Sequence, residues 1–138
     1  MHVIYSFELC CQVDKAVVWM SVQPNAWGDW DQSVSRISRV SDVGCRVVRD
    51  AGSDVVFNVT SEQRDGKPWA LTYDTCTEGS NLLRHERFEV HGDEGGVTTL
   101  FFICGVDGAA SCCMPPNLRV LRGHLKDKQK ALSTYFSD

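Results

Sequence analysis

The chain has 138 residues, 43% of them hydrophobic and 23% charged, and a formal net charge of −4. This length is that of one ordinary domain, and the hydrophobic fraction is sufficient for a buried core, so the chain need not be disordered. The acidic balance argues against nucleic-acid binding, which requires a basic face. No apolar run approaches the roughly 18 residues of a membrane span. We therefore expect a single domain over residues 1–138, with no nucleic-acid partner and no integral membrane association.

The N-terminal segment predicts a strand over residues 2–13. Val3, Tyr5, Phe7 and Leu9 share one parity, and a period of two is typical of a half-buried strand. The segment lacks the basic and apolar regions of a signal peptide, so we expect a cytoplasmic protein.

Two short helices are predicted after this strand. Asp14 is placed as the N-cap of a helix over residues 15–20, and Pro24 opens a second helical segment. Trp27 and Trp30 are three residues apart in that second segment and therefore share one face.

The next 75 or so residues predict only strands and turns. Short turns separate the strands, and Asp65-Gly66 is typical of a hairpin. Such spacing predicts an antiparallel meander. The predicted strands cover residues 33–40, 45–49, 54–62, 68–75, 82–91 and 97–106.

A long C-terminal helix is predicted from one apolar stripe, which consists of Leu118, Leu121, Leu125, Leu132 and Phe136. Basic residues are frequent on the same helix. We interpret them as a solvated face, with attraction to an acidic partner or an anionic membrane surface as the alternative. These residues are Arg119, Arg122, His124, Lys126, Lys128 and Lys130.

The seven cysteines do not predict a disulfide framework, because their number is odd and no secretory signal accompanies them. Two pairs are adjacent, Cys10-Cys11 and Cys112-Cys113, and neighbours on a strand point to opposite faces. No Cys/His group has zinc-ligand spacing. We therefore expect no metal site, and we assign no cofactor.

This order of elements resembles the SRPBCC superfamily, which includes START lipid-transfer domains, polyketide cyclases and birch-pollen-allergen-like proteins. The resemblance covers essentially the whole chain. It is carried by the stretch from Val17-Val18-Trp19 through Pro24 to Trp27-Gly28-Asp29-Trp30, by residues 84–90 and by residues 97–102.

The resemblance implies an α+β helix-grip fold. In this fold a curved antiparallel sheet of about seven strands surrounds a long C-terminal helix, and two short helices follow strand one. It also implies an internal cavity for a small apolar molecule, and in some members cyclisation, dehydration or hydrolysis. It supplies no universal catalytic residue.

Strand parity then selects the side chains that face the concave side of such a sheet. Along residues 82–91, Leu82, Phe88 and Val90 set the inward parity, which Arg84 and Glu86 share. A buried charge is costly unless it is paired, so these two charged side chains are expected to contact each other or Tyr73. The aromatic residues expected to face inward are Tyr5, Phe7, Phe57, Trp69, Tyr73 and Phe88.

Two alternatives for Arg84 and Glu86 stay open. This half of the strand can lie at a solvated rim, or a bulge can reverse the parity and turn His85 and Arg87 inward. Without a bulge, His85, Arg87, Glu89 and His91 are expected to face solvent.

The first functional hypothesis is binding or carriage of a small hydrophobic, lipid- or polyketide-like molecule. The second is a cyclase or dehydratase in which Glu86, Tyr73 or Arg84 assists proton transfer. The third is a regulatory protein-interaction module. The predicted ligand-binding residues are Tyr5, Phe7, Trp27, Trp30, Phe57, Trp69, Tyr73, Arg84, Glu86, Phe88 and Phe101.

Overall fold

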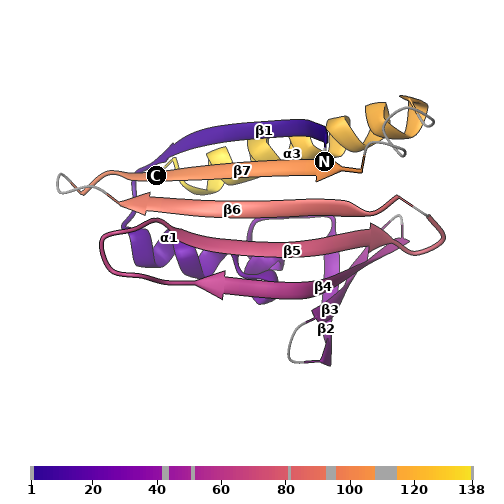
Figure 1. Cartoon of the computed structure of the whole chain (residues 1–138), viewed down its shortest axis with the longest axis horizontal. Coiled ribbons are helices and arrows are strands. Elements are labelled where there is room, and N and C mark those ends of the chain that lie inside the picture. The colour runs from indigo at the N-terminus through magenta and orange to yellow at the C-terminus, as the bar shows by residue number, and fades with distance from the viewer. Residues whose placement is uncertain are drawn as a thin grey trace.

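Seven antiparallel strands form one curved sheet, with strand order β1-β7-β6-β5-β4-β3-β2 (Figure 1). The computed structural model describes residues 2–41, 44–50, 52–80, 82–92, 96–107 and 115–137. The predicted turns at 42–44 and 92–96 and the pair Cys112-Cys113 lie wholly or mostly outside these ranges. The strands are β1 (His2–Cys11), β2 (Val34–Ser41), β3 (Gly44–Arg49), β4 (Gly52–Glu62), β5 (Trp69–Thr77), β6 (Arg84–Gly92) and β7 (Thr98–Val106).

The helices are α1 (Lys15–Val22), the 3-10 helix η1 (Pro24–Asp29) and α3 (Pro115–Tyr135). The carboxylate of Asp14 accepts a hydrogen bond from the backbone N–H of Val17 at 3.0 Å, so the predicted N-cap is confirmed. Among the described residues, no helix combines the length and apolar composition needed to cross a bilayer. The predicted helix-grip arrangement, with two short helices after strand one, is confirmed.

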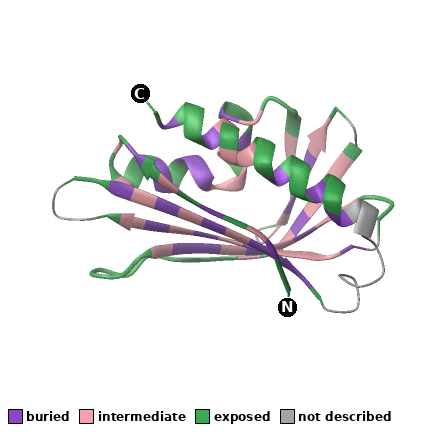
Figure 2. Cartoon of the chain, turned by 90° about the horizontal axis from the view of Figure 1, so that it is seen from above, coloured by how far each residue is buried: buried purple, intermediate pink, exposed green. Residues whose placement is uncertain are grey.

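The first strand pairs with the last, since β1 runs antiparallel to β7 at one edge of the sheet. The chain then crosses the concave side through α1 and η1 and starts β2 at the opposite edge. Figure 2 shows the helices together on one side of the sheet, with the buried residues between the two layers. The predicted stripe of α3 is buried, as shown by Leu118, Leu121, Leu125, Leu132 and Phe136.

A column of aromatic rings fills the interior across the middle of the sheet. Phe7 stacks on Phe102 with ring centroids 5.1 Å apart, and Phe102 lies 4.9 Å from Phe88. The column continues through Tyr73, which is 6.5 Å from Phe88 and 5.3 Å from Trp27. These rings are buried, so this part of the interior is packed with side chains.

Two aromatic residues of the predicted ligand-binding set lie on the convex face: Phe57, which was expected to face inward, and Phe101. Phe57 is opposite Asp74, and Phe101 is opposite Glu89; directly opposed residues share one face of an antiparallel sheet. Apolar residues occupy both parities of β4 and β7, so alternation did not decide the orientation. Val56 and Phe102 take the inward positions next to them.

Cys10 and Cys11 also illustrate the alternation of a strand. Cys10 is exposed, whereas Cys11 is buried. Both thiols are free, as are the other cysteines of the described residues.

Candidate ligand-binding site

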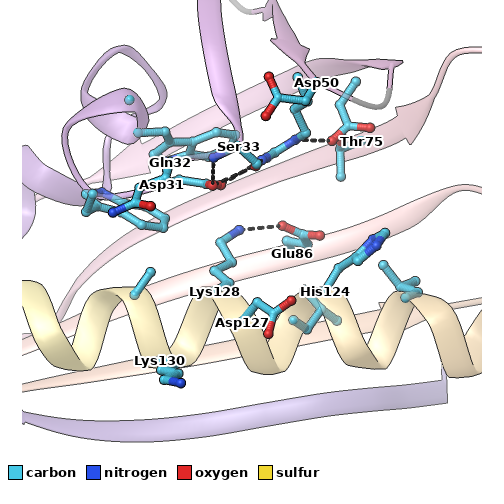
Figure 3. A pocket seen from close by; sticks show the side chains of 18 of the residues that line it. Asp31, Gln32, Ser33, Asp50, Thr75, Glu86, His124, Asp127, Lys128 and Lys130 are labelled. Atoms are coloured by element: carbon cyan, nitrogen blue, oxygen red, sulfur yellow. Dashed lines mark hydrogen bonds and ion pairs between the residues drawn. The ribbon is translucent and has the colours of Figure 1, made fainter.

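A cavity of about 740 Å³ lies between α3 and the sheet, beside η1 (Figure 3). Its walls come from η1 and the residues that follow it, from β3 to β6, and from α3. Several residues of the lining, including Asp29, Gln32 and Asp50, are exposed. The cavity therefore opens to solvent.

Part of the cavity lining is apolar. Trp27 and Trp30 form it from one side, and Leu121, Leu125 and Ala131 of α3 form it from the other. The two indole N–H groups donate to the backbone carbonyls of Val22 and Ser21, both at 2.8 Å. These bonds satisfy the polar edge of each ring, so the indoles present apolar surface to the cavity.

The lining also contains three basic and three acidic side chains in alternation. Each of them contacts the next, so they form a continuous ion chain from Asp31, which follows η1, to Lys128 on α3, and all six line the cavity. The contacts are Asp31–Arg49 at 2.6 Å, Arg49–Asp54 at 3.0 Å, Asp54–Arg84 at 3.6 Å, Arg84–Glu86 at 3.6 Å and Glu86–Lys128 at 3.3 Å.

Glu86 is the most deeply buried member of this ion chain, with 4% of its surface exposed. The Tyr73 hydroxyl donates to Glu86 Oε1 at 2.6 Å, and Lys128 approaches the same oxygen from α3. Burial alone raises the pKa of Glu86, but the charges of Lys128 and Arg84 and the Tyr73 hydrogen bond outweigh it. The pKa is lowered, so Glu86 is ionised.

Tyr73 remains a proton donor in this arrangement. Burial raises its pKa well above the ordinary value, and the charge of Glu86 raises it further. Tyr73 therefore holds its proton and directs it toward Glu86.

Lys128 enters the interior from α3, as Figure 3 shows. Its ammonium group lies 4.7 Å from the ring centroid of Phe102 and 5.0 Å from that of Trp27. Aromatic faces attract a cation at these distances. The aromatic column and Glu86 thus both hold this charge inside the protein.

The hydrogen bonds of Arg84 are long for a side chain that is only 12% exposed. Its Nη1 and Nη2 lie 3.5 Å and 3.3 Å from the hydroxyls of Thr77 and Thr75. Its Nε is buried and has no hydrogen-bond partner among the described residues. A buried donor without a partner is uncommon, because the lost hydration is not replaced.

The predicted inward orientation of Arg84 and Glu86 is confirmed, and so is the predicted contact of Glu86 with Arg84 and Tyr73. The pairing of β6 with both neighbouring strands has no register shift, so the alternative with a bulge is wrong. The solvated-rim alternative is wrong for Glu86, which is buried.

The convex face carries the other parity of β6, as predicted. His85 contacts Asp74 at 2.6 Å and Asp107 at 3.2 Å, and His91 contacts Glu89 at 3.1 Å. Among the described residues, no group of three or more His, Cys, Asp and Glu side chains is placed to hold a metal ion.

The structure divides the predicted ligand-binding residues into three groups. Trp27, Trp30, Arg84 and Glu86 line the cavity. Phe57 and Phe101 lie on the convex face, away from it. The third group belongs to the packed interior and consists of Tyr5, Phe7, Trp69, Tyr73 and Phe88.

Sequence reasoning missed Asp31, Arg49, Asp54 and Lys128. The Lys128 position did carry a signal, since it lies three residues after Leu125 and four before Leu132, inside the apolar stripe. Its assignment to a solvated face is wrong, because its side chain is only 10% exposed.

Comparisons with known protein structures identify the fold. No family model and no curated protein matches the chain. A START superfamily protein from Mycobacterium smegmatis covers 99% of this chain and 98% of its own, with TM-score 0.69 and 12% identity. The Helicobacter pylori protein jhp0584 covers 95% of this chain and 86% of its own, with TM-score 0.70 and 14% identity.

A third similar structure is DynU16, a protein of the dynemicin biosynthetic locus. The match covers 96% of this chain but 46% of DynU16, with TM-score 0.67 and 15% identity. The identities are low while the coverage of this chain is nearly complete. The chain therefore has the START-like helix-grip fold that its order of sequence elements indicates.

Proposed function

We propose that this chain is a binding protein for a small, partly apolar molecule, held in the cavity between α3 and the sheet. The observation that carries the proposal is the cavity itself: Trp27 and Trp30 provide apolar surface beside the buried ion chain. Small-molecule sites are typically concave, with apolar walls and a few placed polar groups. A single domain over residues 1–138 and a cytoplasmic location remain parts of this proposal.

The ligand we propose is less uniformly hydrophobic than a lipid chain. The aromatic column occupies the middle of the interior, so the volume left for a ligand lies beside the ion chain. A molecule that contacts both the apolar and the charged part of the lining needs an apolar body and at least one polar group, because buried charges that lose water must regain hydrogen bonds.

A cyclase or dehydratase is the second candidate, and the contact between Glu86, Tyr73 and Arg84 at the cavity wall favours it. The electrostatics favour binding over proton transfer. A carboxylate whose pKa is lowered is a weak base, and a tyrosine whose pKa is raised is a weak acid. We therefore rank binding first. The protein-interaction module ranks last, because such a module does not need the solvent-open cavity that this chain has.

The experiment is to fill the cavity and measure binding of an uncharged probe. Ala131 lines the cavity from α3, whereas Ser133 is exposed and does not line it. We expect binding of 2-naphthalenemethanol to change the tryptophan fluorescence of the wild type. The control variant Ser133→Trp should show the same change once the signal of its added tryptophan is subtracted. We expect Ala131→Trp to bind it at least about tenfold more weakly, the equivalent of about 1.4 kcal/mol.

Native mass spectrometry of the freshly purified protein provides a second readout of a retained small molecule. The proposal fails if the wild type binds no probe and carries no such molecule. It also fails if a correctly folded Ala131→Trp variant, checked by circular dichroism, binds as well as the wild type.

A further inference from the structure

We infer that the ligand is an organic acid whose carboxylate lies between Arg84 and Lys128 at the inner end of the cavity. This inference rests on the proposed function and names the chemical class of its ligand. Three observations on the ion chain carry it: the distribution of charge, the lengths of the contacts and the way in which Glu86 is already satisfied.

Charge is unevenly distributed along the ion chain. At its inner end, Arg84 and Lys128 flank the carboxylate of Glu86; Arg84 also reaches Asp54 at 3.6 Å, but Asp54 binds Arg49 at the shorter distance of 3.0 Å. With Asp54 assigned to Arg49, the inner end has one positive charge in excess. At its outer end, Asp31 and Asp54 both bind Arg49, which leaves one negative charge in excess. The inner end of the cavity therefore attracts an anion.

Burial of the side chains also increases toward the inner end of the ion chain. The side chains of Glu86, Lys128 and Arg84 are 5%, 10% and 12% exposed. Those of Asp31 and Arg49 are 17% and 24% exposed. Electrostatic attraction is strongest where water is excluded, so the inner, positive end dominates the recognition of a charged group.

The contact lengths show which donors retain hydrogen-bonding capacity. Arg49 is engaged at short range, with Asp31 at 2.6 Å, Ser33 at 2.7 Å and Asp54 at 3.0 Å. Among the described residues, the polar contacts of Arg84 and Lys128 are 3.3 to 3.6 Å long. Charge-assisted hydrogen bonds are usually about 2.7–2.9 Å, so an added oxygen acceptor improves on the present contacts.

Glu86 does not need both cations to remain satisfied. Its shortest hydrogen bond comes from the Tyr73 hydroxyl at 2.6 Å, and Cys104 Sγ lies 3.7 Å from its other oxygen. Lys128 and Arg84 can therefore share their N–H groups with a second carboxylate. Arginine has five N–H donors and lysine three, which is enough for both acceptors.

The outer part of the cavity fixes the orientation of such an acid. Asp29, Asp50 and Asp127 line it and are exposed. Lys130 also belongs to the lining, but Figure 3 shows its side chain on the other side of α3, directed away from Glu86. A carboxylate at the mouth is repelled, so the acid group goes inward and the uncharged or cationic end faces the mouth.

The test compares three probes that share one apolar body: 2-naphthoate, 2-naphthalenemethanol and 2-naphthylmethylammonium. Their affinities for the wild type are measured by isothermal titration calorimetry at neutral pH and low salt. We expect the acid to bind at least about tenfold more tightly than the alcohol, and the amine to bind most weakly.

The matched variants are Lys128→Met and Lys126→Met; Lys126 is exposed on the same helix and does not line the cavity. Lys128→Met is expected to reduce the preference for the acid to less than about threefold while the alcohol keeps its affinity, and Lys126→Met is expected to keep the full preference. If the wild type binds the alcohol as tightly as the acid, this inference is overturned and the proposed function survives. If no probe binds, the inference is overturned, and the proposed function fails as well if native mass spectrometry finds no retained small molecule. The acid-to-alcohol ratio is measured in the wild type, so it decides the inference even if Lys128→Met does not fold.

Discussion

Lys128 Nζ lies 3.3 Å from Glu86 Oε1, and this contact joins the C-terminal helix to the centre of the sheet in the interior of the protein. Both side chains are at most 10% exposed. A buried ion pair of this kind contributes little net stability by itself, but loss of one partner leaves the other charge uncompensated. The pair therefore makes the position of α3 depend on a polar contact at the cavity wall.

Removal of the ammonium group should destabilise the protein. We predict that Lys128→Met lowers the free energy of unfolding by about 2 kcal/mol, because Glu86 keeps Tyr73 and Arg84 but loses a charged partner. Urea denaturation followed by circular dichroism measures the change. Lys126→Met is the control, since Lys126 is exposed on the same helix and its loss should change stability by less than about 0.5 kcal/mol.

A double-mutant cycle separates the pair from its surroundings. Glu86→Gln should be destabilising alone, because Lys128 and Arg84 lose their shared anion. The double variant Glu86→Gln/Lys128→Met should be less destabilised than the sum of the single variants, by about 1 kcal/mol or more. Strict additivity would mean that the two side chains do not interact in solution.

The lowered pKa of Glu86 predicts a specific acid sensitivity. A folded-state pKa below the ordinary 4.5 stabilises the native protein above that pH, and this contribution is lost as the pH falls through the lowered pKa. Wild type should therefore lose more unfolding free energy than Glu86→Gln between neutral pH and about pH 3. Parallel urea titrations across this range measure the difference, and two curves of identical shape would contradict the prediction.

The fold was predictable because the periodicities of several elements are unambiguous. Alternation in β1 and β6 and the stripe from Leu118 to Phe136 each support one secondary structure only. Glu86 and Arg84 were predictable for a related reason, since they share the parity of Phe88 and no register shift interrupts β6. Strand parity is therefore informative wherever one face of a strand is clearly apolar.

The outer half of the ion chain was not predictable in the same way. Asp31 follows η1, Arg49 ends β3, and Asp54 lies near the start of β4, so their contacts depend on where η1 ends and how β3 pairs with β4. No periodicity in the sequence sets these positions. Lys128 differs from them: a charged residue within an apolar stripe is itself a sign of a buried polar contact.

His85 on the convex face should titrate above its ordinary pKa of 6.5. The hydrogen bond to Asp74 at 2.6 Å is the main cause, and Asp107 adds to it. We predict that Asp74→Asn lowers the His85 pKa toward 6.5, as measured by NMR titration with His85→Gln used for assignment. Asp107→Asn should have a smaller effect, because Asp107 is more exposed and lies 3.2 Å away.

The contact between His85 and Asp74 should also make the stability of the protein depend on pH. A histidine whose pKa is raised on folding stabilises the native state fully below its unfolded-state pKa, and this contribution disappears as the pH rises through the folded-state value. Wild type should therefore lose its stability advantage over Asp74→Asn as the pH increases above about 6.5. An advantage that stays constant with pH would contradict this origin.

Phe88 and Phe101 should differ sharply in their contribution to stability, although both are phenylalanines of neighbouring central strands. Phe88 is fully buried in the aromatic column, whereas Phe101 is half-buried on the convex face, where it contacts the ring of His91. We predict a loss of about 3–5 kcal/mol for Phe88→Ala, because a cavity forms inside the column. Phe101→Ala should cost about 1 kcal/mol, since solvent fills the space. Urea denaturation of both variants tests the assignment of the two faces, and equal losses would mean that both rings share the interior.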